Sequence, residues 1–293
     1  MDTKLAKNYT IIFLLILNIL LFFLSFLLEE KYKITKEQEK TIIAYLEKEN
    51  IKIYADIPKK YEPMPQISMK KTKHDDLALQ NIFFKNNIDL IRTEKFEDTI
   101  FKQGEKTLRI NNLFIYFQDL EIKENFKYNR ENSLNIAESY MKPLEQIYGK
   151  MYLDRVIEEE DYFFISYIQK IENYKIFNNV LNVKIYKDGK IKIYFNNYQK
   201  TDIISEKINI CSVDEALYTF SKEIKNLIPD SEIYIRDIDL GYYLKMDNEN
   251  ITFSFYPYYR FYIKGNEMPF YVNAYTNSFE YETTIINAEE IFY

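Results

Sequence analysis

Few side chains in this sequence are of a type that performs catalysis or binds a metal. His74 is the only histidine and Cys211 is the only cysteine among the 293 residues. A metal site built from several histidines is therefore impossible, and a Ser-His-Asp constellation would have to use His74. His74 lies in a polar run of lysine, threonine and aspartate. We expect a solvated loop there, and we predict no catalytic residue and no metal ligand.

The other residues that could bind a ligand or catalyse a reaction give only weak signals. Five glycines are scattered between residues 104 and 265 and cannot form a phosphate-binding loop, so no cofactor is predicted. The acidic run at residues 158–161 could hold calcium or provide a glycosidase pair, but it lacks the alternating spacing of a calcium loop. We expect a solvated turn instead. Cys211 cannot form an intramolecular disulfide, and we expect it to be a structural residue at the start of a helix.

The overall charge restricts the possible partners. The chain has a formal net charge of −6. Phosphate backbones are bound by basic surfaces, so nucleic acid is excluded as a partner. The same acidic surface disfavours docking flat on anionic lipid.

The clearest single feature is an apolar segment near the N-terminus. Residues 9–28 contain no charged side chain. At about 1.5 Å per residue, they span a hydrocarbon core of roughly 30 Å. A cleaved signal peptide is the alternative, but no small-x-small pattern follows the segment. We therefore predict an uncleaved transmembrane helix over residues 9–28, which places the protein in the lipid bilayer through one helix.

The orientation of this helix follows from its flanks. Lys4 and Lys7 precede it, and Lys31 and Lys33 follow it, so the positive-inside rule favours a cytoplasmic N-terminus only slightly. The short tail of residues 1–8 and the large domain that follows are typical of a signal-anchor. We expect a single-pass protein of the cell membrane, with a cytoplasmic tail and an extracytoplasmic C-terminal domain.

Polar side chains inside the span share one side of the helix. Thr10, Asn18 and Ser25 fall within about 80° of one another at helical periodicity, and Leu14 and Leu21 lie on the same stripe. An unpaired amide at mid-membrane is costly, so we predict that this stripe is a helix–helix interface. The alternative is that one asparagine and two hydroxyls are tolerated, with the hydroxyls bonded to their own helix.

Three helices are expected outside the membrane. Residues 35–49 begin with Thr35 and Gln38 at capping-box spacing, and residues 212–227 begin with Ser212 and Glu215 at the same spacing. Residues 131–148 also have helical periodicity, although Pro143 should kink or divide that helix. Weak strand patterns within residues 66–128 lie near Ile82–Phe84, Ile88–Arg92, Thr107–Ile110 and Leu113–Phe117.

The remaining segments predict strands and a duplicated fold. Asp188-Gly189 favours a two-residue hairpin turn, and its flanking strands would place Val183, Ile185, Ile191, Ile193 and Phe195 on one face. The order helix, strand, strand, hairpin occurs in 131–198 and again in 212–284. We therefore expect an α+β fold in which each helix lies on an antiparallel sheet. Residues 30–128 would form the N-terminal part, and residues 129–293 the C-terminal part with both repeats.

The strand at residues 251–264 has two different faces. Its odd positions are apolar, while its even positions include Tyr256, Tyr258, Arg260 and Tyr262. Tyrosine and arginine are enriched at protein–protein hot spots, so the even positions form a candidate ectodomain interaction surface. The alternative is packing on the sheet surface combined with compositional bias.

Several of these features resemble the YycI (WalI) family over nearly the whole chain. The N-terminal span with Asn18, the helix–strand unit at 35–57 and the prolines that follow all carry the resemblance. The closest short motifs are LGYY at 240–243, PYYR at 257–260 and YVNA at 271–274. Family members usually have tryptophan near the PYYR motif, where this chain has tyrosine, which puts one shared hydrophobic contact in doubt.

The resemblance implies a regulator rather than an enzyme. YycI-like proteins act with the related YycH protein on the WalK (YycG) sensor histidine kinase of the WalK/WalR (YycG/YycF) two-component system, which governs cell-wall metabolism in Gram-positive bacteria. A WalK-like kinase and a YycH-like membrane protein are thus the expected partners. An anchored binding module with PepSY-like repeats, acting as a protease inhibitor or a cell-wall ligand receptor, is the alternative. A hydrolase would need a buried carboxylate pair, for which the sequence gives no sign.

Overall fold

The computed structural model describes residues 3–84, 89–112, 114–229, 231–244, 252–266 and 268–280. It is an α+β protein with five helices and a mixed sheet in these ranges, as the sequence predicts. The chain forms two compact units. Unit 1 contains residues 1–64, 208–238 and 259–279, and unit 2 contains residues 65–207, 239–258 and 280–293. The division into 30–128 and 129–293, with its duplicated C-terminal part, stays a prediction.

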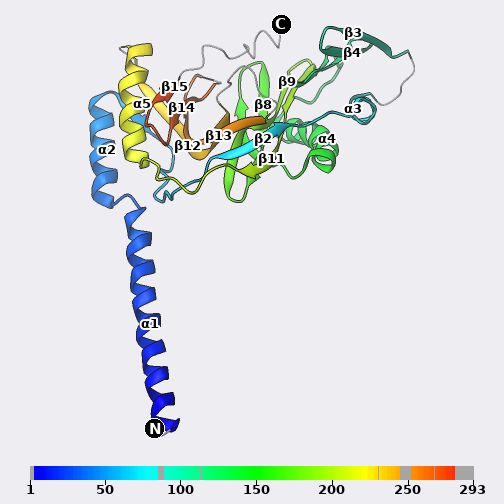
Figure 1. Ribbon diagram of the computed structural model, residues 1–293. Coiled ribbons are helices and arrows are strands. Elements are labelled where there is room, and N and C mark those ends of the chain that lie inside the picture. Colours follow the sequence, from blue (N-terminus) through cyan, green and yellow to red (C-terminus); the bar gives the residue numbers. More distant parts are fainter. Residues whose placement is uncertain are drawn as a thin grey trace. The chain divides into compact units, whose positions relative to one another are not determined.

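The first helix is the membrane candidate. Helix α1 (Thr3–Lys31) is the long blue helix of Figure 1. Within it, Lys7–Ser25 has a mean hydropathy of 2.2, and none of this segment is buried inside the protein. By length and composition the helix can cross a membrane.

In unit 1, helices α2 (Lys36–Lys48) and α5 (Val213–Leu227) lie side by side (Figure 1). Thr35 caps α2, because its hydroxyl accepts from the Gln38 amide at 3.2 Å while Gln38 Oε1 accepts from the Thr35 amide at 2.8 Å. Ser212 and Glu215 form the second capping box, as predicted. Local spacing therefore sets where both helices begin.

The strands of unit 1 complete its core. Strand β1 (Ile51–Ile53) pairs in parallel with the first residues of β12 (Ile233–Leu244). Strand β14 (Phe270–Asn273) lies between β13 (Thr252–Ile263) and β15 (Phe279–Glu280). The buried ring of Phe220 on α5 stacks on Phe261 of β13 with centroids 4.7 Å apart, which fixes the helix on these strands.

Unit 2 is mostly sheet. Its strand order is β11–β2–β13–β12–β9–β10–β6–β5–β4–β3, and β8 and β7 continue from β9. The bounds of its own strands are β2 (Ile67–Lys71), β3 (Ile91–Lys95), β4 (Asp98–Gln103), β5 (Lys106–Ile110), β6 (Ile115–Asp119), β7 (Tyr152–Glu158), β8 (Tyr162–Ile171), β9 (Tyr174–Tyr186), β10 (Ile191–Asn196) and β11 (Tyr198–Ile203). Only antiparallel sheets were predicted, but β12 runs parallel to β9. Such a pair needs a long crossover, and the segment between β9 and β12 provides one.

The hairpin is confirmed, but its loop has three residues (187–189) and not the predicted two, because the Tyr186 amide donates to the Lys190 carbonyl at 2.9 Å and Ile191 is paired with Ile185. Gly189 has a φ of +85° between β9 and β10, and its amide donates to the Tyr186 carbonyl at 2.9 Å. Ile185 pairs with Ile191, and Val183 pairs with Ile193, so the predicted apolar face is formed and buried. Helix α4 (Arg130–Tyr148) packs on β8 and β9 beside this face. It is not divided at Pro143.

The weak strand predictions had mixed outcomes. Residues 82–83 end helix α3 (Asp76–Phe83), so the strand predicted at Ile82–Phe84 is wrong. The Asp75 carboxylate caps that helix by accepting from the Leu77 and Ala78 amides. Strands β5 and β6 confirm the segments near Thr107 and Phe117. Ile88 and Leu113 lie outside the described residues, and β3 begins at Ile91.

Candidate functional site

The residues that follow α1 directly are bonded to the folded part of unit 1. The Ile34 amide donates to the Lys59 carbonyl at 3.0 Å, and the Tyr61 amide donates to the Tyr32 carbonyl at 3.0 Å. The rings of Tyr32 and Tyr61 meet edge to face with centroids 5.9 Å apart. Four residues therefore form a bonded joint between the apolar helix and the body that follows it.

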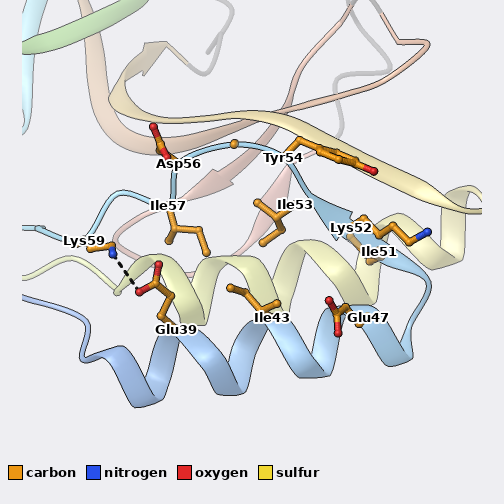
Figure 2. A pocket seen from close by; sticks show the side chains of 11 residues that line it. Glu39, Ile43, Glu47, Ile51, Lys52, Ile53, Tyr54, Asp56, Ile57 and Lys59 are labelled. Atoms are coloured by element: carbon orange, nitrogen blue, oxygen red, sulfur yellow. Dashed lines mark ion pairs between the residues drawn. The ribbon is translucent and has the colours of Figure 1, made fainter.

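A groove lies between α2 and the segment that follows β1 (Figure 2). Its volume is about 510 Å³. Ile43 reaches it from α2, while Ile53 and Ile57 reach it from the opposite side (Figure 2). Ile42 and Leu46 of the same helix are buried in the core. Neighbouring apolar residues of α2 therefore serve two places, the core and the groove.

The rim of this groove is charged. Lys59 Nζ lies 3.1 Å from Glu39 Oε2, and Lys52 is bonded to Glu232. Glu47 and Asp56 also line the groove. No histidine, cysteine, serine or threonine is among the lining residues. An aliphatic floor with a charged rim suits the docking of a peptide segment rather than a reaction.

The predicted membrane stripe remains accessible. Thr10, Leu14, Asn18, Leu21 and Ser25 all lie on α1 and are exposed. Exposed apolar side chains over this length require lipid or partner helices around them. The interface role of the stripe stays a prediction.

The structure corrects the surface predicted on β13. Tyr258, Arg260 and Tyr262 are only 0%, 2% and 6% exposed, so three of the four even positions lie in the interior. Tyr256 is half-buried. The expectation of an exposed even face was wrong because both faces of this strand are covered. Alternating apolar and polar residues indicate an exposed face only in a strand that has one face in water.

His74 is not the solvated histidine that the sequence suggested. Its Nδ1 lies 3.0 Å from the Tyr148 hydroxyl, and the two rings meet at 5.7 Å. Burial, and after it the charge of Lys71, lowers the pKa of His74 to about 4. The partner of His74 is a tyrosine and not the carboxylate that orients the histidine of a catalytic triad. His74 therefore does not have the surroundings of a triad base.

The other candidate groups are also structural. Burial, with the nearby charge of Glu215, raises the pKa of the Cys211 thiol to about 12, so a reactive thiolate is disfavoured. The acidic run 158–161 is exposed, and after Glu158 ends β7 its other three residues form the expected turn to β8. Within the described ranges, no group of three or more His, Cys, Asp or Glu could hold a metal ion.

Comparison with known proteins supports a family relationship. The YycI protein family matches residues 29–275, which is most of the chain. An uncharacterized protein from Eubacterium rectale has a similar fold, with a TM-score of 0.54 and 13% identity over 79% of this chain and 91% of that one. The Bacillus megaterium YpeB C-terminal domain matches with a TM-score of 0.38 and 14% identity over 72% and 97%. No curated protein sequence matches significantly.

The family match includes the joint at residues 31–61 and the groove beside α2. The first solved structure supports the fold alone, because its sequence identity is low. The chain belongs to the YycI family, a family of regulatory proteins rather than enzymes.

Proposed function

We propose that this protein is a single-pass regulator of a WalK-like sensor histidine kinase, acting together with a YycH-like membrane protein in the control of cell-wall metabolism. Family membership supports the regulatory role. The observation that carries the proposal furthest is the bonded joint between α1 and the rest of unit 1. The joint therefore connects the contacts that α1 makes in the membrane with the contacts that the folded part of unit 1 makes outside it.

In this proposal the N-terminus is cytoplasmic and the folded units are extracytoplasmic. Lys4 and Lys7 at the N-terminal end of α1 support this orientation. The stripe of Thr10, Asn18 and Ser25 packs against a kinase helix, with the Asn18 amide hydrogen-bonded across the interface. To regulate, the protein must bind two kinase conformations with different affinities, because equal affinities shift no equilibrium.

The test removes the amide in one variant, and in a second variant it moves the amide without changing the composition of the helix. Asn18→Leu removes it, and Leu17→Asn combined with Asn18→Leu rotates it by about 100° to another side of the helix. We expect both variants to weaken co-purification with the kinase by roughly 3- to 30-fold, the equivalent of about 0.6–2 kcal/mol. Leu20→Ile is the matched conservative control. Unchanged association and unchanged kinase output in both Asn18 variants would remove the membrane interface.

A second candidate is an anchored extracellular binding module, such as a protease inhibitor or a cell-wall ligand receptor. The groove of Figure 2 favours it, because the groove offers an aliphatic floor to a bound segment. In cells lacking the kinase, this candidate predicts that ligand capture by the ectodomain persists. The regulator proposal predicts that the phenotype of deleting this protein disappears in the same cells.

A further inference from the structure

Unit 1 has a second groove, which lies between α2 and α5. Its volume is about 670 Å³. Thr35, Glu37, Gln38, Thr41, Ile42 and Tyr45 line it from the α2 side, and Asp214, Glu215 and Tyr218 line it from α5. Both helices begin at this groove, since Thr35 and Ser212 are their N-caps.

Two tyrosines form the broad apolar part of the groove. The rings of Tyr45 and Tyr218 lie with centroids 5.1 Å apart and an interplanar angle of 39°. Tyr218 is 51% exposed, and the buried side chain of Ile42 lies in the same wall. The exposed ring of Tyr218 is suitable for covering an aliphatic stem, and its face attracts a cation.

The charged residues of this groove all have the same sign. Glu37, Asp214 and Glu215 line it, and no lysine or arginine does. The groove of Figure 2 differs, because its two lysines are each paired with a glutamate. The α2–α5 groove is lined by carboxylates and by the pair of tyrosines together. Carboxylates beside tyrosine rings complement a side chain that has an aliphatic stem and a cationic end.

We propose that the α2–α5 groove binds a lysine or arginine side chain of a protein partner. The chain itself carries a net charge of −6, so a second copy and an anionic lipid surface are both less suitable occupants. Helix α2 begins five residues after α1 ends, which places the groove within reach of another membrane-anchored protein. The inference deepens the proposed function, on which it rests only for the identity of the partner.

The first test measures a defined probe. The full chain in neutral maltoside micelles is titrated with a fluorescein-labelled pentapeptide of alternating leucine and lysine, and binding is followed by anisotropy. We expect Glu37→Gln with Asp214→Asn to weaken binding by about tenfold or more. Glu158→Gln with Glu160→Gln is the matched control, since it removes two charges from an exposed turn. Equal losses in both variants would show non-specific attraction and overturn the assignment.

The second test measures the contribution of the Tyr218 ring separately from that of the carboxylates. Tyr218→Phe retains the aromatic face and should bind the peptide as the native chain does, whereas Tyr218→Leu should bind several-fold more weakly. Circular dichroism of each variant checks that helix content is unchanged. Equal binding by the phenylalanine and leucine variants would exclude the tyrosine face from the site.

The third test identifies the occupant in cells. A photo-crosslinking phenylalanine analogue at position 218 should capture a lysine- or arginine-containing segment of another protein, and Glu37→Gln with Asp214→Asn should abolish the product. The same analogue at Leu227, an exposed residue at the end of α5, is the control. Crosslinks only to a second copy or to lipid would overturn the proposal. If Asn18 variants still lose the kinase in that case, the proposed function stands and only the groove assignment fails.

Discussion

His74 Nδ1 lies 3.0 Å from the hydroxyl of Tyr148, so the loop after β2 is bonded to the last residue of α4. The pKa of His74 is lowered to about 4 by burial and by Lys71. A histidine with a lowered pKa binds fewer protons in the folded state than in the unfolded state between about pH 4 and 6.5. Folding stability should therefore fall as the pH drops through this window.

The expected size of this effect is about 2 kcal/mol between pH 7.5 and pH 5. We predict that the free energy of unfolding of the native chain falls by this amount more than that of His74→Gln. Urea unfolding of both proteins at the two pH values gives the comparison. The same pH dependence in the two proteins would mean that His74 titrates normally in the folded state.

Lys175 joins two aspartates in unit 2. Its Nζ lies 2.8 Å from Asp154 and 2.7 Å from Asp239, and Asp154 is almost fully buried. Lys175→Met leaves buried carboxylate charge without its cation, and we expect a loss of about 3 kcal/mol of unfolding free energy. Urea unfolding measures it. Lys142→Met is the control, because the Lys142–Glu138 pair is exposed and should contribute about 0–1 kcal/mol. Similar losses for both variants would contradict the prediction.

Gly241 is required by close packing within the sheet of unit 2. A Cβ at this position would collide with the Lys175 carbonyl oxygen and come within 2.7 Å of the Phe177 ring. We predict that Gly241→Ala lowers the free energy of unfolding by about 1–3 kcal/mol through overpacking. Gly104→Ala meets no atom within 4 Å and tests the backbone effect alone, since Gly104 has a φ of +55°. Thermal unfolding that is unchanged in Gly241→Ala would exclude the steric constraint.

The joint between α1 and the rest of unit 1 should open when its aromatic pair is removed. Tyr32→Leu or Tyr61→Leu removes an edge-to-face contact worth about 0.5–1.5 kcal/mol. We therefore expect hydrogen exchange of the Ile34 and Tyr61 amides to accelerate by roughly 2- to 13-fold. Tyr54→Leu disrupts a different tyrosine pair, with Tyr234, and should leave these amides unaffected. Equal acceleration in all three variants would show that the contact does not hold the joint.

The features that the sequence predicted correctly depend on neighbouring residues. The charge-free segment within α1, the capping boxes of Thr35 and Ser212, and the Asp188-Gly189 turn are all encoded within a few positions. Caps and turns are formed by hydrogen bonds between adjacent residues, so spacing in the chain is enough to predict them. The buried face of the β9–β10 hairpin follows instead from the apolar alternation of both strands, because the predicted two-residue turn would shift the register by one residue and turn Ile191 and Ile193 away from Val183 and Ile185.

The features that the tertiary structure decided depend on residues far apart in the chain. Tyr258, Arg260 and Tyr262 at even positions of β13 are buried, although their polarity suggested a solvent-facing side. His74 is half-buried because α4 ends beside it at Tyr148, more than seventy positions later. The α2–α5 groove likewise combines residues 35–45 with residues 214–218. Whether a side chain is buried depends on which other elements pack against its strand or helix. A periodic sequence pattern shows only how the two faces of that one strand or helix differ.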